Sequence, residues 1–73
     1  MPNPLATIEE GNGYVLNIFQ SHDDIFNVTS YHAERTAPDG TVTTPQLNMT
    51  AEECIRYLSH VANGLAYQAS KSG

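Results

Sequence analysis

The stretch from Thr50 to Ala69, TAEECIRYLSHVANGLAYQA, decides the fold of this chain. Its first residue is a threonine and Glu53 follows three positions later, the pattern of a capping box, in which each side chain bonds the other residue's backbone N–H. At about 100° per residue, the apolar side chains fall within one arc, as in a helix that packs on a core. They are Ala51, Cys54, Ile55, Leu58, Val61, Ala62, Leu65, Ala66 and Ala69. The stretch therefore predicts an amphipathic helix over 50–69, with residues 70–73 as a frayed tail.

Three apolar or β-branched runs precede this helix and predict three strands, because each is short and bounded by turn-forming residues. The runs cover residues 14–20, 25–35 and 41–44. The turns between them are Ser21-His22-Asp23-Asp24 and Ala37-Pro38-Asp39-Gly40. Pro45 then ends the third strand or restricts it to a sheet edge.

These elements predict one α+β domain over residues 13–69, a three-stranded antiparallel sheet followed by one C-terminal amphipathic helix (β-β-β-α). Residues 1–12, with two prolines and two asparagines, predict a flexible N-terminal lead. The chain has 73 residues, and a chain of this size buries only about 60% of its unfolded surface. Its core alone is therefore marginal, and the single cysteine cannot form an internal disulfide.

The first predicted strand carries large apolar side chains on both faces, whereas a strand covered on one side should alternate with polar residues. The second predicted strand shows the same feature. An exposed apolar face usually marks an interaction site, so we expect a two-fold homodimer that buries it. The candidate dimer face comprises Val15, Phe19, Ile25 and Tyr31. The alternative is that the N-terminal lead folds across this face.

Charge and hydropathy restrict the partners. Three basic and eight acidic residues give a net charge of −5, which disfavours nucleic-acid binding, because that depends on Lys and Arg. The N-terminus shows no signal-peptide pattern, and no stretch approaches the roughly 20 apolar residues that span a bilayer. We therefore expect a cytoplasmic protein that binds neither nucleic acid nor membranes.

No catalytic, cofactor-binding or metal-ligating pattern emerges from the residues. His22, His32 and His60 lie in three different predicted elements, no two of them share metal-ligand spacing, and the sequence has no His-x-x-x-His or Cys-x-x-Cys pair. Cys54 itself lies on the apolar stripe, which is typical of an inert buried thiol. We therefore expect a protein without enzymatic activity, cofactor or metal.

A second set of helix residues lies beside the apolar stripe at helical spacing. Two tyrosines, a histidine and a glycine make an amphipathic surface of the composition expected where another protein packs. These residues, Tyr57, His60, Gly64 and Tyr67, form the candidate protein-contact ribbon, called the tyrosine ribbon below. The alternative is a solvated flank whose tyrosines keep their hydroxyls in water.

Two resemblances bear on this order of elements. The run Tyr14-Val15-Leu16-Asn17-Ile18, the Thr44-Pro45 step with Leu47, and the helix from Ala51 through Ile55 and Val61 resemble a small family of enterobacterial proteins that includes YoaG. That resemblance covers residues 13–68 and implies an intertwined or sheet-paired homodimer, with no activity attached. The longer hairpin at residues 37–40 departs from it, which leaves the register of the third strand open. In architecture alone, the chain is similar to HicB-type antitoxins, which suggests a protein-binding role.

Together these observations predict a non-enzymatic homodimer that binds another protein. The alternative is an antitoxin-like or acidic inhibitor protein that occupies a basic site on its target. The two hypotheses predict different surfaces. A binding module should keep an apolar or tyrosine-rich patch after dimerisation, whereas an inhibitor should gather its acidic residues on one side. The residues concerned are Glu9, Glu10, Asp23, Asp24 and Asp39.

Overall fold

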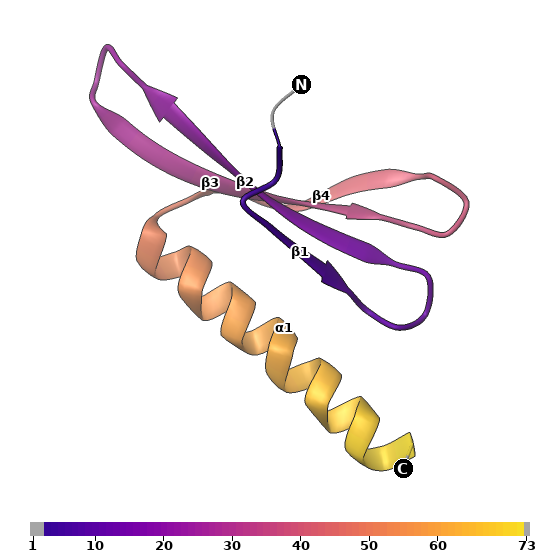
Figure 1. Ribbon diagram of the computed structural model, residues 1–73. Coiled ribbons are helices and arrows are strands. Elements are labelled where there is room, and N and C mark those ends of the chain that lie inside the picture. Colours follow the sequence, from indigo (N-terminus) through magenta and orange to yellow (C-terminus); the bar gives the residue numbers. More distant parts are fainter. Residues whose placement is uncertain (1–2, 73) are drawn as a thin grey trace.

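A computed structural model describes residues 3–72 as a four-stranded antiparallel sheet with one long helix against one face (Figure 1). The elements are β1 (Ala6–Glu9), β2 (Val15–Asp23), β3 (Val28–Thr36), β4 (Val42–Met49) and α1 (Ala51–Ser72). The strand order is β1-β2-β3-β4, so each strand pairs with its neighbour in the chain. The predicted α+β class, with an antiparallel sheet followed by one C-terminal helix, is confirmed.

The prediction of three strands was wrong, because β1 lies within the segment expected to be a flexible lead. Ala6 pairs with Ile18 and Ile8 with Leu16, and both β1 side chains pack against the core on the helix side. A four-residue strand is too short to show a periodicity of its own, so only its partner strand reveals it. This segment extends the sheet sideways and does not fold across its outer face.

The turn between β2 and β3 lies at residues 24–27, later than predicted. The Asp23 carboxylate accepts hydrogen bonds from the backbone N–H groups of Ile25 (2.9 Å) and Phe26 (3.3 Å). Asn27 adopts a positive φ of 52°, which asparagine tolerates better than most residues. These local bonds place Ile25 and Phe26 in the turn, where the sequence predicted strand.

Strand β4 runs past Pro45 to Met49, five residues beyond the predicted end at Thr44. It lies at the edge of the sheet, where a residue without an N–H is tolerated. Its pairing with β3 is irregular, with register shifts around Ala33. The prediction that Pro45 restricts the strand to an edge is confirmed, and the short length was wrong.

The predicted capping box begins α1. The Thr50 backbone N–H donates to Glu53 Oε1 at 3.0 Å, and the Glu53 N–H donates to Thr50 Oγ1 at 3.1 Å. The bond from the Thr50 backbone lowers the pKa of Glu53. In the next turn Arg56 donates to Glu52 at 2.8 Å. The helix continues to Ser72, so the tail expected to fray after Ala69 is helical over its described residues.

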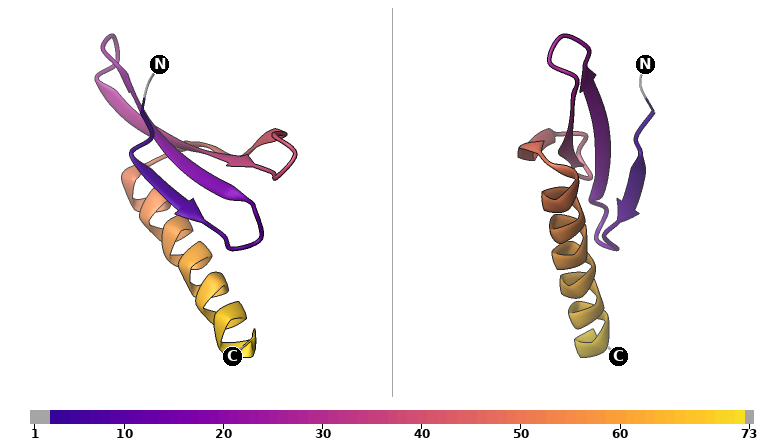
Figure 2. Two further views of the ribbon diagram at one scale, coloured as in Figure 1. Left: turned by 45° about the vertical axis from the view of Figure 1, so that its right-hand side comes forward. Right: turned by 90° about the vertical axis from the view of Figure 1, so that its left-hand side faces the viewer.

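The core lies between α1 and the sheet and is small. Its buried side chains are Leu16, Ile18, Ala33, Met49 and Cys54. Half-buried side chains from β1, β3 and α1 surround them, namely Ala6, Ile8, Tyr31, Tyr57, Leu58 and Val61. The C-terminal part of α1 extends past the end of the sheet in every view (Figure 2). The sheet therefore covers only part of the helix.

Candidate functional site

The four residues of the candidate dimer face do not share one surface. Val15 and Phe19 alternate with the buried side chains of β2, so they lie on the outer face of the sheet. Tyr31 pairs with Met49 and packs against the core on the helix side. Ile25 lies in the β2–β3 turn. The prediction placed Ile25 and Tyr31 on one face of a regular strand, whereas Ile25 lies in the turn and the pairing of β2 with β3 puts Tyr31 on the core side.

The outer face of the sheet is more polar than the sequence predicted. The Phe19 ring stacks on His32 with 5.1 Å between ring centroids, and His32 Nε2 lies 3.1 Å from a Glu34 carboxylate oxygen. On the neighbouring strands, Thr7 donates a hydrogen bond to Asn17 at 2.7 Å. His32 therefore covers one side of the Phe19 ring, and Asn17 and Glu34, which are paired across β2 and β3, place further polar groups on this face.

One exposed apolar surface is the side of α1 that the sheet leaves uncovered. It consists of Ala51, Ile55, Ala62, Ala66 and Ala69, all exposed, and is called the α1 flank below. Ile55 is 65% exposed and the nearby Leu5 is 60% exposed. These two side chains line a hollow of about 190 Å³ together with Ala51, Leu58 and parts of the core. The predicted stripe is therefore only partly buried, because it is wider than the contact with the sheet.

A second exposed apolar surface lies at the β2–β3 hairpin. Strand β1 pairs with β2 only as far as Ile18, and β4 pairs with β3 only as far as Tyr31. Residues 21–30, called the β2–β3 arm below, therefore project as a two-stranded hairpin (Figure 1). At its tip, Ile25 is 87% and Phe26 75% exposed. Large apolar side chains in such a position are unusual for a surface without a partner.

Polar contacts stabilise the arm from within. His22 Nδ1 and Thr29 Oγ1 lie 2.9 Å apart across the hairpin, and the Asp23 carboxylate holds the turn. Between the arm and the start of α1 lies a hollow of about 370 Å³, lined by Asp23, Phe26, Val28, Thr29, Ser30, Asn48, Met49 and Thr50. The tip and this hollow together form a surface that sequence reasoning missed. The sequence signal for this turn was Asp23, whose side chain can accept the N–H of Ile25 two residues later, together with Asn27, which tolerates the positive φ at the end of the turn.

A third feature is the bidentate ion pair between Glu10 and Arg35. The Arg35 Nε and Nη2 atoms donate to the two Glu10 carboxylate oxygens, both at 2.9 Å, and these bonds raise the pKa of Arg35. The guanidinium carbon lies 4.1 Å from the centroid of the Tyr14 ring. Burial and the Glu10 charge raise the pKa of Tyr57 nearby. The pair fastens the β1–β2 turn to β3.

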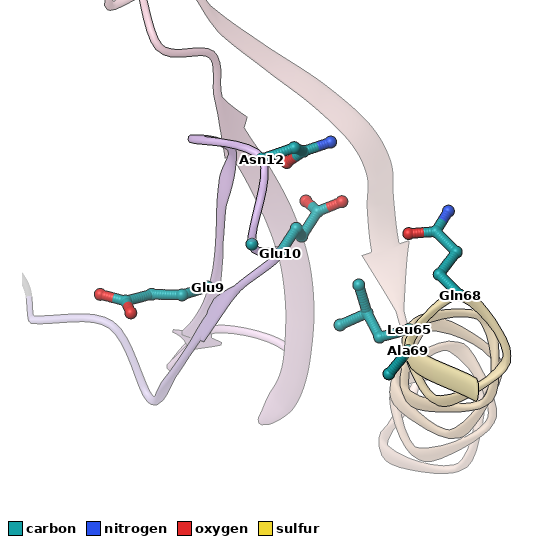
Figure 3. A pocket seen from close by; sticks show the side chains of 7 residues that line it. Glu9, Glu10, Asn12, Leu65, Gln68 and Ala69 are labelled. Atoms are coloured by element: carbon teal, nitrogen blue, oxygen red, sulfur yellow. The ribbon is translucent and has the colours of Figure 1, made fainter. Parts of the chain in front are cut away.

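A hollow of about 360 Å³ separates this turn from the C-terminal part of α1 (Figure 3). It is lined by Glu9, Glu10, Gly11, Asn12, Leu65, Gln68 and Ala69. The side chains of Glu10 and Asn12 point toward α1, and that of Glu9 points away from it (Figure 3). Arg35 binds both Glu10 oxygens, so this carboxylate is already paired where it faces the hollow. No group of three potential metal ligands occurs within residues 3–72.

The residues of the tyrosine ribbon differ in their surroundings. Tyr57 is half-buried against the core, whereas His60 and Gly64 line a hollow of about 220 Å³ beside Arg35. Tyr67 is exposed, with the Lys71 ammonium 5.3 Å from its ring centroid. Three of the four residues, His60, Gly64 and Tyr67, are thus exposed, and their contact with a partner stays a prediction.

The acidic residues lie at opposite ends of the sheet. Glu9 and Glu10 flank the β1–β2 turn, and Asp39 lies in the β3–β4 turn at the same end. Asp23 and Asp24 lie at the other end, in the β2–β3 arm. The single acidic surface that the inhibitor hypothesis predicts is therefore not formed within one chain.

Comparison with protein-family models, curated proteins and solved structures finds no match. The resemblances to the family that includes YoaG and to HicB-type antitoxins stay predictions. The part of the chain that the structure describes contains no helix with the length and hydropathy to cross a membrane.

Proposed function

We propose that this chain is a non-enzymatic protein-binding module that works as a homodimer in the cytoplasm. The observation that carries the proposal is the size of its exposed surface. Folded monomers follow a scaling with mass that gives about 4,450 Å² for 8.0 kDa, whereas this chain exposes 5449 Å². The excess of about 1,000 Å² is comparable to the about 800 Å² that each partner buries in a standard interface.

The shape of the chain supports the same proposal. Its radius of gyration is 13.7 Å, against about 11 Å for a compact domain of this length. The molecule measures 49 × 27 × 16 Å, so it is a flat, elongated pair of layers. A chain with so thin a core gains stability when a second chain covers its exposed apolar side chains.

The β2–β3 arm supports binding of a further protein. The arm projects beyond both β1 and β4, so a dimer formed along α1 or β1 leaves its tip accessible. Ile25 and Phe26 at the tip could insert into an apolar pocket of the partner, as buried apolar and aromatic anchors do at the centre of interfaces. The hydrogen bonds to Asp23 hold the turn in place and so reduce the entropy that binding would cost.

The homodimer is tested by size-exclusion chromatography with light scattering. We expect a mass twice the 8.0 kDa of the chain. A species of single-chain mass at high micromolar concentration would contradict the homodimer.

The protein contact is tested by pull-down from a lysate of the source organism. Wild type is compared with an arm variant, Ile25→Ser with Phe26→Ser, and with a variant of the tyrosine ribbon, His60→Ala with Tyr67→Ala. All four side chains are exposed, so both variants should keep the wild-type circular dichroism spectrum. We expect the arm variant to lose a partner that the other two retain. Loss only in the ribbon variant would move the contact to α1, and identical partner sets in all three would argue against protein binding at either surface.

A further inference from the structure

The α1 flank and the open edge of β1 lie on the same side of the molecule. Strand β1 is an outer strand of the sheet, so one of its edges pairs with no strand in residues 3–72. The helix and β1 run in the same direction in all views (Figures 1 and 2). Leu5, just before β1, lines the hollow that contains Ile55. An unpaired strand edge and an exposed apolar side of the helix are therefore found on the same side of the molecule.

The two features are also aligned along their length. At one end of β1, Leu5 lies at the level of Ala51 to Leu58. At the other end, Glu9 and Glu10 share a hollow with Leu65 and Ala69. The middle of β1 therefore lies at the level of Ala62. One two-fold axis can pass through the centre of the strand and beside the centre of the flank.

We infer that a second copy of this chain binds at this place. Strand β1 pairs with the β1 strand of the second copy in antiparallel orientation, and the two α1 helices pack antiparallel along their flanks. The axis passes at Thr7 or Ile8 and beside Ala62. The result is one continuous sheet with two helices on the same face. This inference rests on the homodimer of the proposed function and identifies its interface.

The side chains of the flank complement one another across this axis. With Ala62 at the centre, Ile55 of one helix lies opposite Ala69 of the other, and Leu58, half-buried beside the flank, lies opposite Ala66. Large side chains thus meet small ones, which allows two helices to interdigitate closely. The flank carries no charged residue, so pairing leaves no buried unpaired charge.

Strand β1 lacks two features that protect an edge from pairing, a proline within the strand and a charge that points inward. Natural edge strands are often blocked by prolines or by charges that point inward. The opposite edge strand, β4, contains Pro45, whereas residues 6–9 contain no proline and only one charge, Glu9. With the axis at Thr7 or Ile8, Glu9 lies opposite Leu5 or Thr7 of the second copy, so like charges are not opposed.

Cross-linking of neighbouring cysteine variants tests the interface. Ala62→Cys places a thiol beside the axis, and Asn63→Cys places one a residue further along, on the side of α1 that faces away from the sheet. Both positions are exposed, and the buried Cys54 thiol is present in both variants. With a short bis-maleimide, we expect a covalent dimer from Ala62→Cys and none from Asn63→Cys or wild type.

A second pair of variants measures association directly. Ala62→Glu brings two like charges together at the axis and should reduce the mass in light scattering from two chains to one, whereas Asn63→Glu should stay a dimer. Circular dichroism checks that each variant keeps its helix, and the cysteine variants test the interface even if Ala62→Glu unfolds. A wild-type dimer in which Ala62→Cys does not cross-link would overturn this interface and leave the homodimer standing. A monomeric wild type would overturn both.

Discussion

At the residue scale, the Thr50 side chain stabilises the first turn of α1. Its hydroxyl accepts the Glu53 N–H at 3.1 Å, one of the backbone donors that a helix start cannot satisfy internally. Thr50→Ala should therefore lower the free energy of unfolding by about 0.5–2 kcal/mol, measured by urea denaturation. Thr50→Ser keeps the acceptor and should stay close to wild type. Equal destabilisation by both substitutions would contradict a role for the hydroxyl.

The Glu53 carboxylate should make stability depend on pH. The hydrogen bond from the Thr50 backbone N–H favours the ionised form and holds the pKa of Glu53 below its ordinary value of 4.5. A lowered pKa means that the stabilisation is present above the ordinary pKa and is lost as the pH falls through the folded value. Wild type should therefore lose more stability than Glu53→Gln in urea titrations from pH 6 down to about pH 3. Asp39, whose pKa is also lowered, titrates in both proteins and contributes equally to both losses. Equal losses of stability in the two proteins would therefore exclude a contribution from Glu53.

At the scale of single elements, Gly13 allows the β1–β2 turn to approach the β3–β4 turn closely, although the two turns are distant in the sequence. It has a φ of +88°, and a Cβ at this position would lie 2.7 Å from Cγ of Pro38 in the β3–β4 turn. Gly11 has a similar φ of +82° but open space around it. Both Gly→Ala variants should lose about 1 kcal/mol or more from the positive φ, and Gly13→Ala should lose additional stability from the clash.

Thermal or urea unfolding of the two glycine variants separates the cost of the positive φ from the cost of the clash with Pro38. Equal losses would mean that Pro38 moves aside without a penalty. A larger loss for Gly11→Ala would contradict the close approach of the two turns.

Local signals explain which elements could be predicted from the sequence. The helix and its cap depend on side chains within one or two turns, so their spacing was sufficient. Strand β1 depends on pairing with residues of β2 that lie six to twelve positions further along, and its four residues carry no pattern of their own. The β2–β3 turn was predicted too early because four polar residues at 21–24 have the composition of a loop, while the bonds to Asp23 form the turn just after them.

At the scale of the whole molecule, the sequence indicated an incomplete core but not where it is incomplete. A helical wheel shows which side chains of α1 are apolar, but not how many of them the sheet can cover. The predicted dimer face assumed that the second side of β2 is apolar, and there His32 and Asn17 provide polar neighbours. The exposed large apolar side chains lie instead on or beside α1, at the β2–β3 arm and on β4, and their exposure depends on the relative placement of the elements.

A homodimer that supplies the missing packing must unfold in a concentration-dependent way. When a native dimer unfolds to two separate chains, mass action favours the dimer as the concentration rises, so Tm increases. We expect the Tm of wild type to rise over a concentration range of about a hundredfold, measured by circular dichroism. In Ala62→Glu the like charges prevent association, so its Tm should be lower and independent of concentration, whereas Asn63→Glu should follow wild type. A wild-type Tm that does not change with concentration would show that the five buried side chains within residues 3–71 hold the fold without a partner, and would contradict the homodimer.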